Sequence, residues 1–342
     1  MTRTLVTGGS GFLGSATVRH LLARGDSVRV FDLLDAADRP ANVEFVRGDV
    51  RDPIAVARAV AGVDVVHHQV AQVPLAKDLE LLHTVNVDGT ERVLAEAARV
   101  GVQKVVVVST SAVYGVPQSL PITSATPPRP AEAYGVAKLA AEARVETWRN
   151  RGLDVAVVRP RTILGPGRLG IFQLLFEWVR RGRPVYTLGN GRNRYQFVHV
   201  DDLAALCLLA EKPGNGLWLG GATQFGTMGD LLQNLVAHAR TGSPVRALPF
   251  GPTQRAMTWT SRLGLSPLAS YHALAYGREI WFDTEQTRRA LGWTPQHSND
   301  AMIAQSYDWY VQNRELVLQQ SNASPHRSRL APRILAVLDW LP

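Results

Sequence analysis

A tyrosine and a lysine stand four residues apart in the segment AEAYGVAK, as Tyr134 and Lys138. Residues with this spacing share one face of a helix. An ammonium beside a phenol stabilises the phenolate, so a tyrosine whose pKa is ordinarily about 10 becomes an acid or base near neutral pH. In the upstream segment KVVVVSTSAVYG, the apolar run VVVV is followed by hydroxyl side chains that can hold a substrate oxygen. The pattern predicts proton transfer at a substrate hydroxyl.

A second chemical signal is the segment TGGSGFLG near the start of the chain, with Gly8, Gly11 and Gly14 at three-residue steps. It follows an apolar run and precedes a helical pattern, which is the context of a dinucleotide-binding loop. In such a loop the first glycine allows a tight turn, the second lets the backbone approach a pyrophosphate, and the third lets the helix pack on the sheet. Backbone N–H groups at the helix start then hold the phosphates.

Two aspartates support this interpretation. Asp32 ends the next apolar run, where a carboxylate accepts hydrogen bonds from ribose hydroxyls and repels a 2′-phosphate. Leu33 and Leu34 follow it, and neither can receive a 2′-phosphate, so the sequence favours NAD over NADP. Asp49 lies in GDVRD after the third apolar run and is expected near the adenine edge.

The elements that must position these residues alternate between strand and helix patterns. Runs such as VVVV and VAVV are apolar throughout, as in strands buried on both faces. Alternation of this kind predicts an α/β fold, a doubly wound, Rossmann-like parallel sheet. Strands are expected at 2–8, 27–32, 63–70, 104–110 and 153–160, with helices at 15–25, 55–62, 84–102 and 134–152.

After about Arg161 the alternation breaks, and loop-rich segments separate short strands at 184–189, 195–200 and 216–221 from helices at 201–211, 228–239 and 300–316. We therefore expect a smaller, interleaved C-terminal region that binds substrate. The predicted domains are 1–165 with returning segments near 195–215 for the cofactor, 166–320 for the substrate, and a tail at 321–342.

Composition limits the class of protein. The chain has 342 residues, a net charge of +8 spread mostly over scattered arginines, and a lone cysteine, Cys207. No basic stripe interleaved with aromatics predicts nucleic-acid binding. No apolar run approaches the ~20 residues of a membrane span, and the N-terminus does not resemble a signal peptide. We expect a cytoplasmic protein.

Taken together, TGGSGFLG, Asp32, GDVRD, VNVDGTERVL, STSAVYG, YGVAK, RPRTILGPG, YQFVHVDDLA and ALGWTP resemble the extended short-chain dehydrogenase/reductase family. This is the NAD-dependent epimerase/dehydratase group, which also holds 3β-hydroxysteroid dehydrogenases. The resemblance covers about residues 3 to 315. It implies hydride transfer between a carbinol carbon and NAD.

The resemblance also implies roles for particular residues. Ser111 would hold the substrate oxygen, Tyr134 would be the acid/base, and Lys138 would assist Tyr134 and bind a ribose. Asn86 would support the active site, and Gln69 to Ala71 would pass beside the cofactor. The expected cofactor contacts are Gly8, Gly11, Phe12, Leu13, Gly14, Asp32, Asp49, Val50, Gln69, Val70, Ala71, Asn86, Ser109, Tyr134, Lys138 and Pro160. Relatives often form homodimers through two long helices, here those near 84–100 and 134–150.

The substrate side departs from the sugar-nucleotide pattern. Thr162 stands where many such enzymes carry an asparagine that touches the diphosphate, and Tyr195 stands where many carry a phosphate-gripping arginine. Candidate substrate contacts are therefore Ser111, Thr162 and Tyr195, with Arg161, Arg168, Arg192 and Arg194 as arginines that could substitute. The helical segment after Arg168, aromatic on one side, is expected at the substrate rim or in the core.

Two further features of the sequence bear on metal binding and membrane binding. The histidines at 67, 68, 83 and 199 match no metal-ligand spacing, so no metal is expected. In the tail HRSRLAPRILAVLDWLP, three arginines precede an apolar stretch. It could lie on a membrane surface, but docking on the protein itself or on a second subunit is favoured.

Three hypotheses follow for the function. The first is an NAD-dependent epimerase of a sugar nucleotide, of the UDP-hexose 4-epimerase kind. The second is an NAD-dependent dehydrogenase or ketoreductase acting on a lipid or other hydrophobic alcohol, like the 3β-hydroxysteroid dehydrogenases. The third is a dinucleotide-sensing module without catalysis, which the retained Ser111, Tyr134 and Lys138 disfavour. A dehydratase is disfavoured because no Asp-Glu pair follows Ser111.

Overall fold

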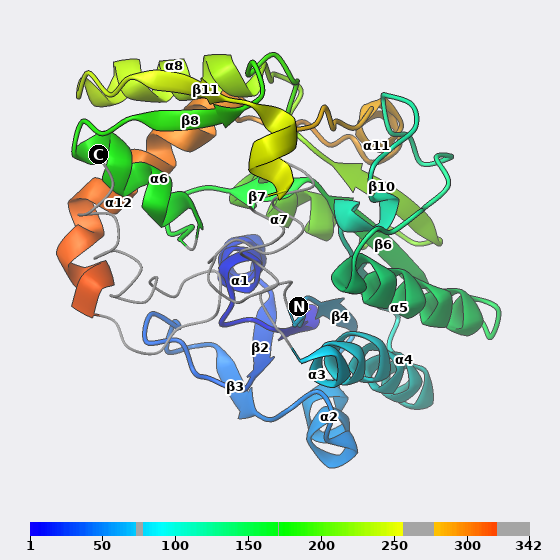
Figure 1. Ribbon diagram of the computed structural model, residues 1–342. Coiled ribbons are helices and arrows are strands. Elements are labelled where there is room, and N and C mark those ends of the chain that lie inside the picture. The colour runs from blue at the N-terminus through cyan, green and yellow to red at the C-terminus, as the bar shows by residue number, and fades with distance from the viewer. Residues whose placement is uncertain (73–77, 170, 256–276, 320–342) are drawn as a thin grey trace. The chain divides into compact units, whose positions relative to one another are not determined.

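The computed structural model describes residues 1–72, 78–169, 171–255 and 277–319 (Figure 1). The chain divides into two compact units. The first comprises Met1–Thr162, Val200–Gly221 and Phe282–Gln296. The second comprises Ile163–His199, Ala222–Trp281 and the residues from His297 onward. The tail predicted at 321–342 lies outside the described residues.

The first unit is built on a seven-stranded sheet whose order is β10-β6-β5-β4-β1-β2-β3, and all neighbouring strands in it are parallel. The strands are β1 (Arg3–Thr7), β2 (Ser27–Asp32), β3 (Glu44–Arg47), β4 (Val65–His68), β5 (Lys104–Val108), β6 (Val155–Pro160) and β10 (Gly216–Gly220). A strand order that runs outward in both directions from β1 and β4 confirms the predicted doubly wound α/β fold.

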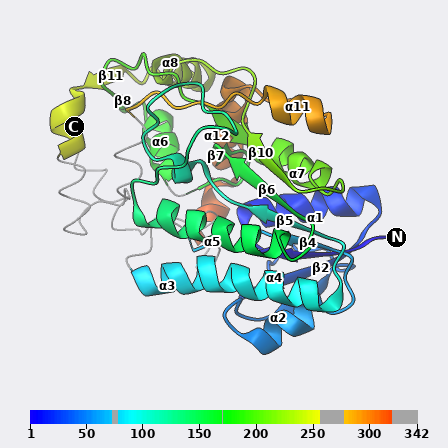
Figure 2. The same cartoon turned by 90° about the vertical axis from the view of Figure 1, so that its right-hand side faces the viewer.

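Helices cover both faces of this sheet (Figures 1 and 2). One face carries α2 (Pro53–Val60), α4 (Gly89–Val100) and α5 (Ala133–Arg149), and the other carries α1 (Phe12–Arg24) and α7 (Val200–Leu209). Three short helices complete the unit: α3 (Leu79–His83), the 3-10 helix η2 (Ser111–Tyr114) and α11 (Glu285–Leu291). A π-helical segment, η1 (Thr84–Asp88), joins α3 to α4.

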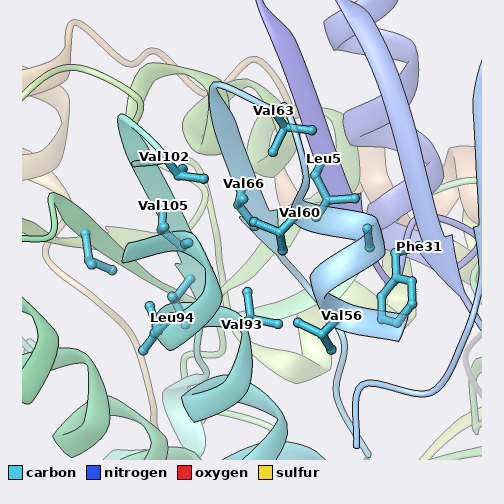
Figure 3. Packing of buried hydrophobic residues seen from close by; sticks show 14 of the residues in the cluster. Leu5, Phe31, Val56, Val60, Val63, Val66, Val93, Leu94, Val102 and Val105 are labelled. Carbon is cyan, nitrogen blue, oxygen red and sulfur yellow. The ribbon is translucent and has the colours of Figure 1, made fainter. Parts of the chain in front are cut away.

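The core explains why the strands read as apolar throughout. In β1, Leu5 packs in the cluster under α2 and α4, whereas its neighbour Val6 packs in the cluster under α1. Successive strand side chains point to opposite faces, so burial on both faces requires apolar residues at every position. Figure 3 shows the larger cluster, in which Val56 of α2 and Val93 of α4 meet side chains of β1, β2, β4 and β5.

Strand β10 shows the limit of the sequence pattern. It was expected among the short strands of the later region, and it pairs instead with β6 at the edge of the large sheet. Residues of the second unit separate β6 from β10 along the chain. The strand–helix alternation is therefore interrupted between these two strands, and the sequence pattern could not indicate that they pair. Helix α7, which precedes β10, carries the lone Cys207, fully buried, and burial raises the pKa of its thiol.

The second unit holds α6 (Ile171–Arg180), β8 (Val185–Leu188), β9 (Phe197–His199), α8 (Met228–Ala239), β11 (Val245–Leu248) and α12 (Asn299–Gln319). Strand β11 pairs with β8, and β7 (Thr162–Leu164) pairs with β9. The carboxylate of Glu177 on α6 joins α6 to α12, since it accepts hydrogen bonds from Tyr310 at 2.8 Å and from Arg314 at 2.5 Å. No helix in the described ranges has the length and apolar character needed to cross a bilayer.

Candidate active site

Helix α5 carries Tyr134 and Lys138, the predicted acid/base and its cationic partner. Glu132 caps it, because its carboxylate accepts the backbone N–H groups of Tyr134 at 2.9 Å and Gly135 at 2.7 Å. Tyr134 therefore stands in the first turn, and Lys138 follows one turn later. Lys138 is 1% exposed and its Nζ donates to the carbonyl of Val108, at the end of β5, at 2.7 Å.

The charge of Lys138 responds to this environment. Burial lowers its pKa to about 8, and the nearby carboxylate of Glu142 opposes that shift. Lys138 is thus mostly protonated at neutral pH, but its proton is much less tightly held than that of a solvated lysine. Lys138 therefore carries a positive charge one helical turn from Tyr134 on α5.

A buried network that the sequence analysis did not single out lies one turn further along α5. Glu142 pairs with Arg159 of β6 and also accepts a hydrogen bond from the Ser109 hydroxyl. Arg159 in turn donates to the Tyr114 hydroxyl at 2.7 Å. The spacing 134, 138, 142 on one helix face was the sequence signal for Glu142, but its arginine partner comes from a strand and becomes visible only in the fold.

The 3-10 helix η2 brings Ser111 to α5. The Thr110 hydroxyl caps η2 by accepting the N–H of Ala112 at 3.1 Å. The carbonyl of Ala112 lies so close to Gly135 that a Cβ there would stand 2.6 Å from it, so the backbone of η2 lies against the first turn of α5. Ser111 is 5% exposed, and its Oγ accepts a hydrogen bond of 2.8 Å from Nη1 of Arg161.

The glycine loop fits a dinucleotide. Gly8 has φ of +72°, a left-handed conformation that favours glycine, and a Cβ there would stand 2.9 Å from the N atom of Val70. A Cβ at Gly14 would stand 2.1 Å from the carbonyl oxygen of Gly8. The loop therefore lies directly against the start of α1 and the end of β4. Gly11 is the N-cap of α1 and has no side chain that could cap the N–H groups of the first helical turn, the groups that hold a pyrophosphate in such loops.

Asp32, at the end of β2, contacts the glycine loop. Its carboxylate accepts the N–H of Ser10 at 3.1 Å, and burial raises its pKa while backbone hydrogen bonds from Leu34 and Ser10 oppose the shift. This placement fits the predicted ribose ligand. Asp49 instead forms a close ion pair with Arg51, with 2.6 Å between Oδ2 and Nη2, and that pair lowers its pKa. An adenine contact by Asp49 stays a prediction.

The segment that follows β4 is bonded to α1 on one side and to the π-helical segment η1 on the other. The Gln69 side chain donates to Thr17 of α1 at 2.9 Å, and the Asn86 amide donates to the carbonyl of Gln72 at 3.0 Å and accepts its N–H at 3.1 Å. Asn86 thus holds the backbone that leaves β4, from a π-helical turn of the kind that is frequent at functional sites.

His68, at the same strand end, is fully enclosed. Its Nδ1 lies 2.9 Å from the Thr7 hydroxyl and its Nε2 lies 3.0 Å from the Thr90 hydroxyl. Burial, together with the positive charge of Lys138, lowers the pKa of His68 to about 3. It is therefore a neutral link between β1 and α4 at neutral pH.

The remaining predicted cofactor residues line the same strand ends. They belong to the first unit and have the following places: Phe12 and Leu13 at the start of α1, Val50 buried after β3, Val70 and Ala71 after β4, Ser109 after β5, and Pro160 at the end of β6. Carboxyl ends of parallel strands form one edge of a sheet, the usual ligand edge of this fold class.

The predicted substrate residues divide between the units. Arg161 and Thr162 belong to the first, and Arg168, Arg194 and Tyr195 belong to the second. Tyr195 is 1% exposed, with its ring 5.0 Å from that of Phe197. The Arg194 guanidinium lies 4.8 Å from the Phe225 ring centroid and 4.7 Å from that of Trp281. Both side chains thus have aromatic neighbours within their own unit.

Comparison with known proteins shows the family of the chain. The family model of the NAD dependent epimerase/dehydratase family matches residues 4–216. The chain is 46% identical to the uncharacterized protein y4nG of Sinorhizobium fredii, over 98% of this chain and 85% of that protein. It is 31% identical to a 2-alkyl-3-oxoalkanoate reductase of Stenotrophomonas maltophilia, over 86% and 96% of the two chains. It is also 31% identical to a UDP-glucose 4-epimerase of Mycolicibacterium smegmatis, over 90% and 98%.

The chain belongs to the NAD dependent epimerase/dehydratase family. The match covers more than half of its length, including the glycine loop and the residues of helix α5. This confirms the predicted family and NAD as the cofactor, and it makes the protein an enzyme.

Proposed function

We propose that this protein is an NAD-dependent oxidoreductase that interconverts a secondary alcohol and a ketone, with Tyr134 as the acid/base. The observation that carries the proposal is Lys138, buried and held by the Val108 carbonyl at 2.7 Å, one turn from Tyr134 on the same face of α5. Such a cation has little solvent screening, so it strongly favours the tyrosinate that must accept a hydroxyl proton.

The residues of the chain divide the work. The Ser111 hydroxyl holds the reacting oxygen of the substrate, Tyr134 takes its proton during oxidation and returns it during reduction, and Lys138 stabilises the phenolate. NAD would be held by the glycine loop and Asp32, and when bound it would accept a hydride from the carbinol carbon or return one to it. The network of Glu142 and Arg159 keeps α5 against the ends of β5 and β6 and so holds the helix that carries Lys138 and Tyr134.

We place net oxidation or reduction ahead of epimerisation. Tyr195 stands where a phosphate-gripping arginine is expected in sugar-nucleotide enzymes, and its side chain is packed on Phe197 with 1% exposure. Similarity to a 2-alkyl-3-oxoalkanoate reductase supports a substrate that is not a nucleotide. Epimerisation of a UDP-hexose is the second candidate, supported by equal identity to a UDP-glucose 4-epimerase.

The test compares both candidates in one assay. The protein is incubated with NAD or NADH and with either a 2-alkyl-3-oxo acid or UDP-glucose, while NADH absorbance and the sugar products are followed. Net redox predicts stoichiometric change in NADH with the oxo acid. Epimerisation predicts UDP-galactose without net change in NADH.

The first testable prediction concerns Tyr134→Phe. Turnover should fall about 100- to 10,000-fold, the usual contribution of a general acid/base. NAD affinity measured by calorimetry should change little, because the ring that packs in the helix remains. Turnover that survives unchanged in Tyr134→Phe would contradict the proposed function.

A further inference from the structure

We propose that Arg161 recognises a carboxylate whose carbon is two bonds from the reacting carbon, so that the substrate is a 3-hydroxy acid or the corresponding 3-oxo acid. The inference rests on the function proposed above, because it takes Ser111 as the residue that holds the reacting oxygen. The inference adds a carboxylate to the description of the substrate that carries this oxygen.

The geometry places a cation on the catalytic hydroxyl itself. Nη1 of Arg161 lies 2.8 Å from Oγ of Ser111, and the Arg161 side chain is 1% exposed. In a 3-hydroxy acid the carboxyl carbon is two bonds from the carbinol carbon. A substrate whose hydroxyl meets Ser111 therefore carries its carboxylate within reach of the same guanidinium.

The guanidinium of Arg161 lies between a hydroxyl and an aromatic ring, since it donates to Ser111 and its carbon lies 5.6 Å from the centroid of the Phe282 ring. The backbone on both sides is also bonded: the N–H of Arg161 donates to the Gly220 carbonyl at 2.8 Å, and Phe282 forms a parallel bridge with Ile122. A planar, pre-oriented fork of donors matches the two oxygens of a carboxylate better than it matches a neutral hydroxyl.

A second arginine two residues earlier provides the contrast. Arg159 donates to Glu142 and to the hydroxyl of Tyr114, both side chains that build the fold. Arg161 donates to the hydroxyl that is expected to meet the substrate. Of the two arginines near the end of β6, Arg161 is the one that contacts the hydroxyl proposed to hold the reacting oxygen.

The position of Arg161 also argues against a role in diphosphate binding. In a nucleotide hexose oxidised at C4, the diphosphate hangs on C1, across the full breadth of the sugar ring from the reacting oxygen. A guanidinium in contact with the hydroxyl that holds that oxygen is at the wrong end of such a molecule. It suits an anion attached close to the carbinol.

The reaction balances with the groups already named. Oxidation breaks the O–H and C–H bonds of the carbinol: the proton passes to Tyr134 and the hydride, with its electron pair, passes to NAD⁺. The products are a 3-oxo acid and NADH. Reduction reverses each transfer, and the carboxylate keeps its charge throughout, so its pairing with Arg161 persists in both directions.

The experiment uses a graded series of straight-chain 3-hydroxy acids and their methyl esters, which lack the negative charge and carry one additional methyl group. The full-length wild-type protein with NAD should prefer the acids. Arg161→Gln should lower kcat/KM for an acid about 10- to 100-fold, the range of a hydrogen bond to a charged group, and for its ester by about threefold at most. Arg161→Lys should retain part of the preference. Arg19→Gln, which removes an exposed arginine, is the matched control and should change neither.

Calorimetric binding of acid and ester to the NAD-loaded protein gives a readout that does not need turnover, and the preference should be lost there as well. An equal loss for acid and ester in Arg161→Gln would show that Arg161 only positions Ser111, and would overturn the inference. Turnover of neutral alcohols or UDP-glucose without any advantage for acids would overturn it while leaving the proposed function intact. No Tyr134-dependent turnover of any carbinol would count against both.

Discussion

At the scale of single residues, the site depends on how burial changes proton affinity. Lys138 and His68 both lie beside the end of a central strand, and burial lowers both pKa values, to about 8 and about 3. The consequences differ because Lys138 serves the reaction whereas His68 joins Thr7 to Thr90. Two pH-dependent predictions follow, one for activity and one for stability.

The prediction for Lys138 concerns the alkaline side of the pH profile. With a pKa of about 8, the ammonium that supports the Tyr134 phenolate is lost as pH rises through that value. We expect kcat/KM to fall above about pH 8. Lys138→Arg keeps its charge throughout this range, so its residual activity should fall only at higher pH. A wild-type profile that stays flat well beyond pH 9 would contradict the role given to Lys138.

The prediction for His68 concerns stability in acid. The unfolded chain binds a proton at this histidine near pH 6.5, whereas the folded protein binds it only near pH 3. Between these values the unfolded state holds more protons, so the free energy of unfolding decreases as the pH is lowered, by about 1.4 kcal/mol per pH unit from this group. His68→Gln should show a slope shallower by one proton between pH 6 and 4 in urea unfolding. Identical slopes would rule out the neutral, enclosed histidine.

At the scale of elements, much of the site could be predicted from the sequence. The glycine loop, Asp32 and the Tyr134–Lys138 pair follow from local spacing, because each depends on residues within one turn or one strand–helix junction. Ser111's contact with Arg161, and Glu142's with Arg159, each join residues from separate elements. No local pattern specifies which strand arginine meets which helix or loop side chain, so these contacts required the fold.

The glycine loop offers a test at this scale. In Gly14→Ala the new methyl group would stand 2.1 Å from the carbonyl oxygen of Gly8 and 2.6 Å from Cα of Gly9, and both are backbone atoms that cannot move without distorting the turn. We expect destabilisation by about 1–3 kcal/mol, as for overpacking, together with weaker NAD binding. Ser15→Ala, on the next residue of α1, should be nearly neutral. Urea unfolding and NAD calorimetry measure both effects.

At the scale of the whole molecule, cofactor choice should appear as thermal stability. A ligand that binds only the folded protein stabilises it by about 2.7 kcal/mol at a hundred times its Kd. We expect NAD to raise the melting temperature and NADP at the same concentration to raise it less, because the Asp32 carboxylate repels a 2′-phosphate. Asp32→Ser should narrow this difference. Equal shifts with both dinucleotides in the wild type would contradict the assignment of Asp32.

The buried Cys207 makes it possible to measure how often the cofactor-binding unit opens. Cys207 is fully enclosed in α7, so an alkylating reagent reaches its sulfur only when that helix leaves the sheet. Since the chain has no other thiol, each molecule gains either one adduct or none, and intact mass reports the fraction that has opened. The rate of adduct formation then measures how often the cofactor-binding unit opens, and NAD should slow it.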